Sequence, residues 1–177
     1  MSNKLRYEDI QFCPKCGHKL KEKFIHGRKR KYCPSCNFVY YQDPKVGAGV
    51  VVEERGKILL VRRGREPYIG KWCLPGGFVE YDEGPEQAAI RECKEETNLD
   101  VEIDKLIGIF PYLNDMRGPG ILIAYKVKII GNSKNLNPGD DADEVRFFSI
   151  DELPPMEKIA FRTNREIINS WIKEKKK

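Results

Sequence analysis

The sequence of 177 residues carries a formal net charge of +5, with 33% charged and 40% hydrophobic residues, which is typical of a soluble globular protein. No apolar run approaches the roughly 20 residues that span a bilayer, so we expect no membrane partner. The opening stretch MSNKLRYEDIQF lacks the apolar core of a secretory signal, and we therefore expect a cytoplasmic protein.

Two cysteine pairs define the first predicted module, residues 11–42. Their pattern is C-x2-C, sixteen intervening residues and C-x2-C, formed by Cys13, Cys16, Cys33 and Cys36. In a cytosolic chain such pairs indicate a metal site rather than disulfides. Four thiolates complete a tetrahedral Zn²⁺ shell, so we expect a structural zinc, which a module of this size needs for stability.

The residues between the pairs, GHKLKEKFIHGRKRKY, predict a β-hairpin with a basic tip. His18 and His26 lie in this stretch, but the four cysteines already suffice as ligands. Basic residues crowd two segments, 19–31 and 173–177. A solvated surface explains them most simply, and attraction for polyanions such as nucleotides or RNA is the alternative.

A linker, YYQDPKVG, follows this module, because a residue before proline disfavours helix. We therefore expect two parts: an N-terminal segment with the cysteine module, residues 1–42, and a second domain, residues 43–177. The second domain opens with VGAGVVVE and KILLVRR, which predict a hairpin around the turn ERGK. The next segment, WCLPGGFVE, is extended and is broken by Gly76-Gly77.

A glutamate-rich helix is predicted over residues 85–97. Gly84 can cap it, Pro85 suits the first helical position, and Asn98 suits a left-handed C-terminal residue. At about 100° per residue, Glu92, Glu95 and Glu96 share one face of this helix. The neighbouring face is apolar, with the unpaired Cys93 expected to be buried, as is Cys73.

Like charges on one helical face repel each other unless a cation offsets them. Arg91 can pair with Glu95 four residues away, but a single arginine cannot neutralise three glutamates. Mg²⁺ prefers oxygen ligands and binds a few carboxylates together with phosphate oxygens. The pattern therefore favours a divalent-metal site, and an exposed acidic face is the simpler alternative.

Three more strands are expected after the helix, in VEIDKLIGIFPYL, ILIAYKVKII and EVRFFSI. A last helix is expected at about 157–173. The strands and helices alternate without the regular spacing of a parallel sheet, which favours an α/β fold with a mixed sheet and helices on its faces. The expected packing face of the last helix consists of Ile159, Ile167, Ile168 and Trp171.

The glutamate-rich segment closely resembles the Nudix box, the signature of Nudix hydrolases. Every charged position of the signature matches, and Asn98 replaces a glycine of the family pattern. Asn tolerates the left-handed conformation better than most residues, so this departure is compatible with an intact site. The matching positions are Gly77, Glu83, Arg91, Glu92, Cys93, Glu95, Glu96 and Leu99.

The resemblance implies a Nudix α/β/α sandwich preceded by a zinc ribbon, and hydrolysis of a pyrophosphate bond in a nucleoside diphosphate linked to another moiety. By this resemblance, Glu92, Glu95, Glu96 and the carbonyl of Gly76 would hold Mg²⁺ or Mn²⁺. Arg91 would orient the glutamates by pairing with Glu95 or Glu83. The general base varies within the family, and Glu92 and Glu144, in the loop before VRFFSI, are the two candidates. A homodimer is also expected from the resemblance.

A four-cysteine ribbon before a Nudix domain is similar to the NADH pyrophosphatase branch and its relatives. The further motif of NADH-specific members, Ser-Gln-Pro-Trp-Pro-Phe-Pro, is replaced here by IGIFPYLNDMRGPG. The resemblance therefore extends to ribbon-bearing Nudix proteins for which ADP-ribose and FAD are proposed substrates. Candidate residues for stacking on adenine are Phe110, Tyr112, Tyr68 and Phe161, and candidates for a phosphate contact are Arg117 and Arg162, although ordinary packing explains each equally well.

Two other functions stay open at this point. An RNA-end processing enzyme would remove nucleotide caps, with the basic ribbon binding the RNA. A non-catalytic regulator would sense nucleotides or bind nucleic acid, although such a protein would be expected to lose some of the glutamates that this chain keeps.

Overall fold

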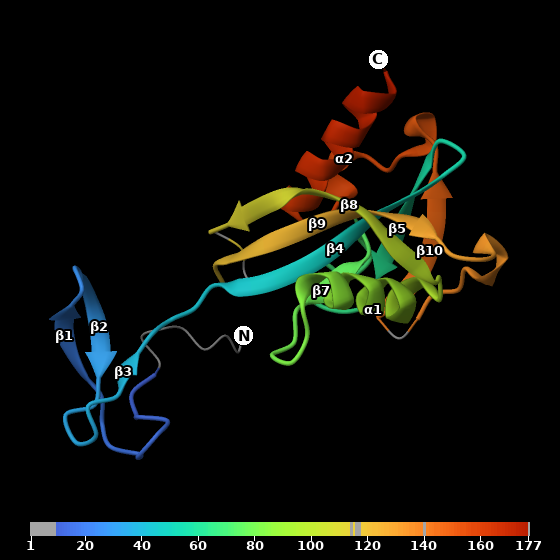
Figure 1. Cartoon of the computed structure of the whole chain (residues 1–177). Helices are drawn as coiled ribbons and strands as arrows, with labels where there is room; N and C mark the ends of the chain where they lie inside the picture. Colours follow the sequence, from blue (N-terminus) through green and yellow to red (C-terminus); the bar gives the residue numbers. More distant parts are fainter. Residues whose placement is uncertain (1–9, 114, 116–117, 140, 177) are drawn as a thin grey trace. The chain divides into compact units, whose positions relative to one another are not determined.

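The chain forms two compact units, the first ending at Pro44 and the second beginning at Lys45 (Figure 1). A computed structural model describes residues 10–113, 115, 118–139 and 141–176. Arg117, a candidate phosphate contact, lies outside the described residues. In the part of the chain that is described, no helix is both long and apolar enough to cross a membrane.

The small unit is a three-stranded antiparallel sheet in the order β1-β2-β3, which confirms the expected hairpin. Its turn is His26-Gly27, and both residues have positive φ angles, 49° and 74°, as a two-residue hairpin turn requires. The basic residues follow the turn along a strand and do not form its tip, which corrects that detail of the prediction. The strands are β1 (Lys21–Ile25), β2 (Arg28–Tyr32) and β3 (Val39–Tyr40).

The four cysteines converge at one end of this unit. Each pair closes a tight turn, because the Gly17 amide donates to the Cys13 carbonyl at 2.8 Å and the Asn37 amide to the Cys33 carbonyl at 2.9 Å. The four sulfur atoms lie within 4.8 Å of one another, with Sγ–Sγ separations of 3.3 Å, 3.4 Å and 3.7 Å for three of the pairs. Tetrahedral Zn–S bonds of about 2.3 Å imply S–S separations of roughly 3.8 Å, so the cluster is compatible with one Zn²⁺.

The larger unit is built on a mixed sheet in the order β10-β5-β4-β9-β8. The central strands β4 and β9 are parallel, and the other pairs are antiparallel, which confirms the predicted mixed sheet. Two short strands extend it, β6 on β5 and β7 on β4. The strands are β4 (Lys45–Glu54), β5 (Lys57–Arg63), β6 (Trp72–Cys73), β7 (Gly76–Phe78), β8 (Val101–Tyr112), β9 (Gly120–Ile129) and β10 (Ala142–Phe148).

One helix covers each face of this sheet, so the unit is an α/β/α sandwich (Figure 1). Consecutive side chains of β4 point to opposite faces of the sheet, so this strand packs against both helices. Val50 and Val52 pack with Cys93 of helix α1 (Pro85–Thr97). Val51 packs instead with Ile168 of helix α2 (Arg162–Lys175). The unpaired Cys73 and Cys93 are both buried, as expected.

The last helix begins at Arg162, five residues later than predicted. The preceding residues are needed elsewhere, because Ile159 forms a bridge with Trp72 and the Ala160 amide donates to the Trp72 carbonyl at 2.8 Å. Only a short 3-10 turn, Met156–Lys158, occupies the start of the expected helix. Ile159 is fully buried, but it belongs to this extended segment and not to the helical face.

We predict that Ile168→Ala destabilises the larger unit by about 2–5 kcal/mol, because it leaves a cavity beneath α2. Ile168 is completely buried in the cluster that joins α2 to the sheet. The free energy of unfolding from urea titration measures this loss. Lys173→Ala, on the exposed side of the same helix, is the matched control and should change stability by less than about 0.5 kcal/mol. Equal losses in both variants would contradict the assigned packing.

Removal of zinc with a selective chelator should unfold residues 10–44 and leave the larger unit folded. The apolar cluster of the small unit is limited to a few residues around Cys13, Leu20 and Cys33, and zinc binding supplies on the order of 10–16 kcal/mol in comparable peptides. Amide NMR signals before and after chelation report each unit separately. Simultaneous loss of both sets of signals would mean that the two units unfold together.

Candidate active site

The glutamate-rich helix α1 has the predicted bounds, Pro85–Thr97. Asn98 ends it in the left-handed conformation, with φ 59° and ψ 12°, so the replacement of glycine is accommodated there. The Asn98 side-chain amide also donates to the Asn135 carbonyl at 3.0 Å. The C-terminal end of α1 is therefore fixed against the loop that leads to β10.

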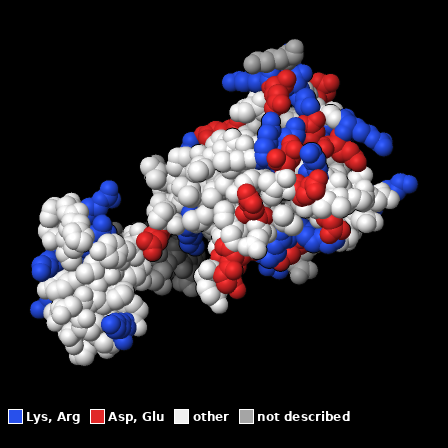
Figure 2. Space-filling model, viewed as in Figure 1, with Lys and Arg blue, Asp and Glu red and all other residues white. Residues whose placement is uncertain are grey.

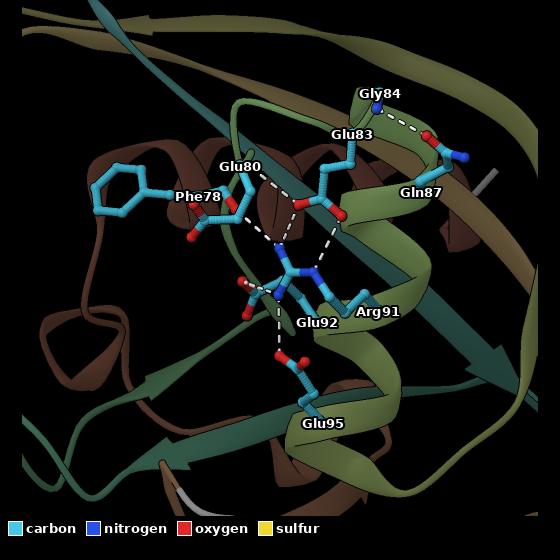
Figure 3. Close-up of polar contacts among 8 residues, drawn as sticks. All are labelled: Phe78, Glu80, Glu83, Gly84, Gln87, Arg91, Glu92 and Glu95. Atoms are coloured by element: carbon cyan, nitrogen blue, oxygen red, sulfur yellow. Dashed lines mark hydrogen bonds and ion pairs between the residues drawn. The ribbon is translucent and has the colours of Figure 1, made fainter.

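Arg91 holds three carboxylates around its guanidinium group (Figure 3). It donates to Glu83 from Nε at 3.0 Å and from Nη2 at 2.5 Å, and Nη1 lies 2.9 Å from both Glu92 and Glu95. A further bond, from Nη2 to the Phe78 carbonyl at 3.1 Å, links this group to the end of β7. The hydrogen bonds from Arg91 lower the pKa of Glu83, and Glu83 in turn raises the pKa of Arg91. Arg91 thus pairs with both predicted partners and also with Glu92.

Glu96 is the buried member of the acidic group, with 8% of its surface exposed. Burial raises its pKa to about 8, and the neighbouring charge of Glu92 adds to the rise. Its Oε2 accepts a hydrogen bond from the Gly76 amide at 3.0 Å. Burial also raises the pKa of Glu92. The helix therefore carries carboxylates that are costly to ionise unless a cation is present.

The glycines of strand β7 allow the sheet to come close to the acidic face of α1. Gly76 has φ 149°, and a Cβ atom there would overlap the Ala48 carbonyl oxygen of β4. A Cβ atom at Gly77 would overlap the Glu92 carboxylate. Glycines at these two positions let the strand pair with β4 and lie against the acidic face of α1. The metal-binding role expected for the Gly76 carbonyl stays a prediction.

A cleft of about 440 Å³ opens beside the glutamates, lined by Arg65, Glu92, Glu95, Glu96, Gly139 and Asp141. Three of these residues, Arg65, Gly139 and Asp141, were not singled out from the sequence, and Arg65 forms an ion pair with Asp141 at 2.6 Å. Gly139 anchors the loop here, because its amide donates to the Glu96 carbonyl at 3.1 Å. The acidic run in PGDDAD is the only sequence signal that points to Asp141.

The donor set of this cleft fits a hard divalent cation such as Mg²⁺ or Mn²⁺, which takes carboxylate oxygens. Glu92, Glu95 and Glu96 bring three carboxylates into one cleft. Arg91 contacts Glu92 and Glu95, but among the described contacts it forms no ion pair with Glu96. A cation bound beside Glu96 would therefore offset the charge that Arg91 leaves uncompensated.

Glu144 lies in strand β10 and not in the preceding loop, which corrects its predicted position. Its carboxylate pairs with Arg62 at 3.3 Å, and the two residues are cross-strand neighbours. Glu144 is not among the residues that line the acidic cleft. The role of either glutamate as a proton acceptor stays a prediction.

The candidate substrate-binding residues separate into two groups. Tyr112 and Phe161 line a small cavity of about 40 Å³ that also reaches Gly76 and Gly77. Tyr68, Tyr112 and Arg162 line a larger opening of about 470 Å³.

Three of these lining side chains also make contacts within the protein. Tyr68 stacks edge-on against Phe161 at 5.4 Å, and Arg162 donates to the Pro111 carbonyl at 2.7 Å. Phe110 packs against the apolar cluster under α2, so the structure does not bring it into either opening.

Comparison with known proteins identifies the family. The NUDIX domain profile matches residues 43–170. The ADP-ribose pyrophosphatase of Methanocaldococcus jannaschii is 36% identical over 160 residues, covering 90% of this chain and 88% of the relative. The crystal structure of a NUDIX hydrolase from Nitrosomonas europaea matches with a TM-score of 0.82 and 34% identity, covering 93% of this chain and 92% of that chain.

A more distant relative is the NAD-capped RNA hydrolase NudC of Pseudomonas putida, 25% identical over 149 residues. The match covers 82% of this chain but 50% of NudC, so the chain spans about half the length of that relative. The domain match and the intact acidic helix agree: the chain belongs to the Nudix family and is a Nudix pyrophosphatase.

Proposed function

We propose that the protein hydrolyses the pyrophosphate bond of a nucleoside diphosphate linked to another moiety, with ADP-ribose as the first candidate and FAD or NAD(H) as others. The products would be a nucleoside monophosphate and a phosphorylated second product. The single observation that carries this proposal is the buried Glu96, held with Glu92 and Glu95 at one cleft beside the glycine strand. The M. jannaschii relative named ADP-ribose pyrophosphatase supports the choice of first substrate.

In this proposal Glu92, Glu95 and Glu96 would hold Mg²⁺ or Mn²⁺, together with the carbonyl of Gly76. A metal bound there would supply positive charge to offset that of the diphosphate. Arg91 is a positioning residue, because it holds the carboxylates of Glu92 and Glu95 in one orientation. Glu83 in turn fixes Arg91 through two hydrogen bonds.

The chemical step needs a group that accepts a proton from the attacking water. As the water oxygen bonds to phosphorus, the P–O bond to the bridging oxygen breaks and that oxygen leaves with the second phosphate. Glu92 is the proposed base, because its carboxylate lines the cleft and its pKa is raised. Asp141 lines the same cleft and is the alternative that the geometry adds to the two candidates from the sequence.

The cavity beside β7 is the proposed site for part of the nucleoside. Thr163 and Asn164 line it, with 3% and 5% of their surfaces exposed. The Asn164 oxygen accepts from the Leu74 amide at 2.7 Å, and among the described residues its NH₂ group has no hydrogen-bond partner, so it can donate to a ligand. Tyr112 and Phe161 add aromatic walls to the same cavity. These groups are suited to hydrogen bonding and stacking with a base or a ribose.

Two alternatives follow from other observations. The NAD-capped RNA hydrolase among the relatives, together with the basic small unit, favours RNA 5′-end processing as a second candidate function. A nucleotide-sensing regulator is the third, although all charged positions of the acidic helix are intact. A homodimeric state and a cytoplasmic location remain predictions.

A substrate panel tests this proposal. With Mg²⁺ or Mn²⁺ we expect ADP-ribose to yield AMP and ribose 5-phosphate, because the glutamate cluster can hold a metal against paired phosphates. FAD, NADH, nucleoside triphosphates and NAD-capped RNA complete the panel, scored by the identity of the products. Preference for capped RNA would select the second function, and binding of nucleotides without any turnover would select the regulator.

Glu96→Gln should lower the turnover of the best substrate by roughly 10²–10³-fold, a loss typical of removing one electrostatic contact to the transition state. The variant should stay folded and be at least as stable as the wild type, because it removes a buried carboxylate from a repulsive group. Turnover numbers and thermal unfolding measure the two effects.

Glu86→Gln is the matched control, since Glu86 lies exposed in the first turn of the same helix. Its turnover should equal that of the wild type. If Glu96→Gln keeps wild-type turnover at matched metal concentration, Glu96 is not part of the site.

A further inference from the structure

The positive charge of the chain is concentrated in the small unit. Residues 10–44 contain eight Lys and Arg against two Asp and Glu, whereas residues 45–177 contain 22 against 23. Figure 2 shows the contrast, with blue side chains over a largely white small unit and mixed red and blue on the larger one. The net charge of +5 therefore comes from the small unit, which we also call the ribbon, and not from the larger, catalytic unit.

The hairpin sorts its charges onto two faces. Cross-strand partners share a face, and the partners Lys21 with Tyr32, Lys23 with Arg30 and Ile25 with Arg28 lie on one of them. We call this the basic face, composed of Lys21, Lys23, Arg28, Arg30 and Tyr32. It carries no carboxylate of the hairpin, because the only one, Glu22, lies on the opposite face with Lys29 and Lys31.

The cations of the opposite face are already engaged. Lys29 forms an ion pair with Glu22, and Lys31 is buried, with its Nζ donating to the Ile10 carbonyl at 2.6 Å. Among the described residues, by contrast, Lys21, Lys23 and Arg28 form no ion pair with a carboxylate. Three exposed cations on one face are thus available to an anionic partner.

Aromatic rings lie beside two cations of the basic face, Lys23 and Arg30. The Lys23 ammonium is 5.6 Å from the centre of the Tyr32 ring, and the Arg30 guanidinium is 4.5 Å from the centre of the Tyr41 ring. Tyr41 keeps 46% of its surface exposed. The Arg30 Nε is buried without a hydrogen-bond partner, so this guanidinium is already partly dehydrated. Cations along a backbone track, with rings on which bases can stack, are the two features of single-strand binding sites.

We propose that the basic face of the ribbon binds single-stranded RNA. The cations contact phosphates along a short segment, and Tyr41 offers a stacking surface for a base. RNA is chosen because its recognition is dominated by single strands with unstacked bases, and such a strand uses both the cations, at its phosphates, and the ring of Tyr41, by stacking. This binding does not depend on hydrolysis, and it gives the catalytic unit a second way to select substrates that carry a polynucleotide chain.

The test measures affinity of the full-length protein for a 20-nucleotide single-stranded RNA with a 5′-hydroxyl end, without added Mg²⁺ or Mn²⁺. Under these conditions no scissile pyrophosphate is present, so failure of the proposed reaction cannot affect the result. About three phosphate contacts predict a slope of log K against log salt near −2, at roughly −0.7 for each contact on a single strand.

Lys23→Ala and Lys29→Ala form the matched pair, since each removes one lysine from an opposite face of the same hairpin. Lys23→Ala should weaken binding about threefold or more and reduce the salt slope by about 0.7, whereas Lys29→Ala should have little effect. Tyr41→Ala should weaken binding with an unchanged slope, because stacking does not displace counterions. The zinc content of each variant confirms an intact ribbon.

Equal losses in the two lysine variants would overturn the proposal, because binding would then depend only on net charge. The absence of measurable binding at low salt would also overturn it. Tighter binding to phosphatidylserine vesicles than to RNA, lost in Lys23→Ala, would assign the face to a membrane surface instead.

Discussion

Repulsion among carboxylates on one helix is the constraint on which the catalytic unit depends. The fork of Arg91 contacts Glu83, Glu92 and Glu95, but its single positive charge cannot neutralise all three. Glu96 lies buried beside them with a raised pKa. Such a group is stable only when a proton or a metal cation compensates its charge. The remaining features of the site serve this arrangement: two glycines bring the sheet close, and the loop before β10 closes the end of the helix.

The sequence predicted the local part of this site well, because the signals are local. Pro85 and Asn98 set the ends of α1 through backbone preferences that need no tertiary context, and both ends were right. The spacing of Arg91 from Glu83 and Glu95 likewise follows from helical geometry and a short connecting loop. The strands of the mixed sheet were also recognisable from their apolar runs, although the parallel pairing of β4 with β9 was not.

Long-range contacts explain what the sequence could not provide. The start of α2 was misplaced because Ile159 and Ala160 pair with Trp72, far away in the chain. Arg65 and Asp141 reach the acidic cleft from two separate loops, so neither stands out in its own segment. The ion pair of Glu144 with its cross-strand neighbour Arg62 is likewise not indicated by the segment in which Glu144 lies. Each of these contacts joins residues that lie more than sixty positions apart in the sequence.

The burial of the two unpaired cysteines has a practical consequence. Cys73 and Cys93 have 2% and 0% of their surfaces exposed, and burial raises the pKa of Cys93 to about 11. A thiol that is both inaccessible and protonated is a poor nucleophile. Reagents that alkylate cysteine should therefore react with the native molecule only at the four cysteines of the small unit, where thiol modification would report on metal loss without touching the catalytic chemistry.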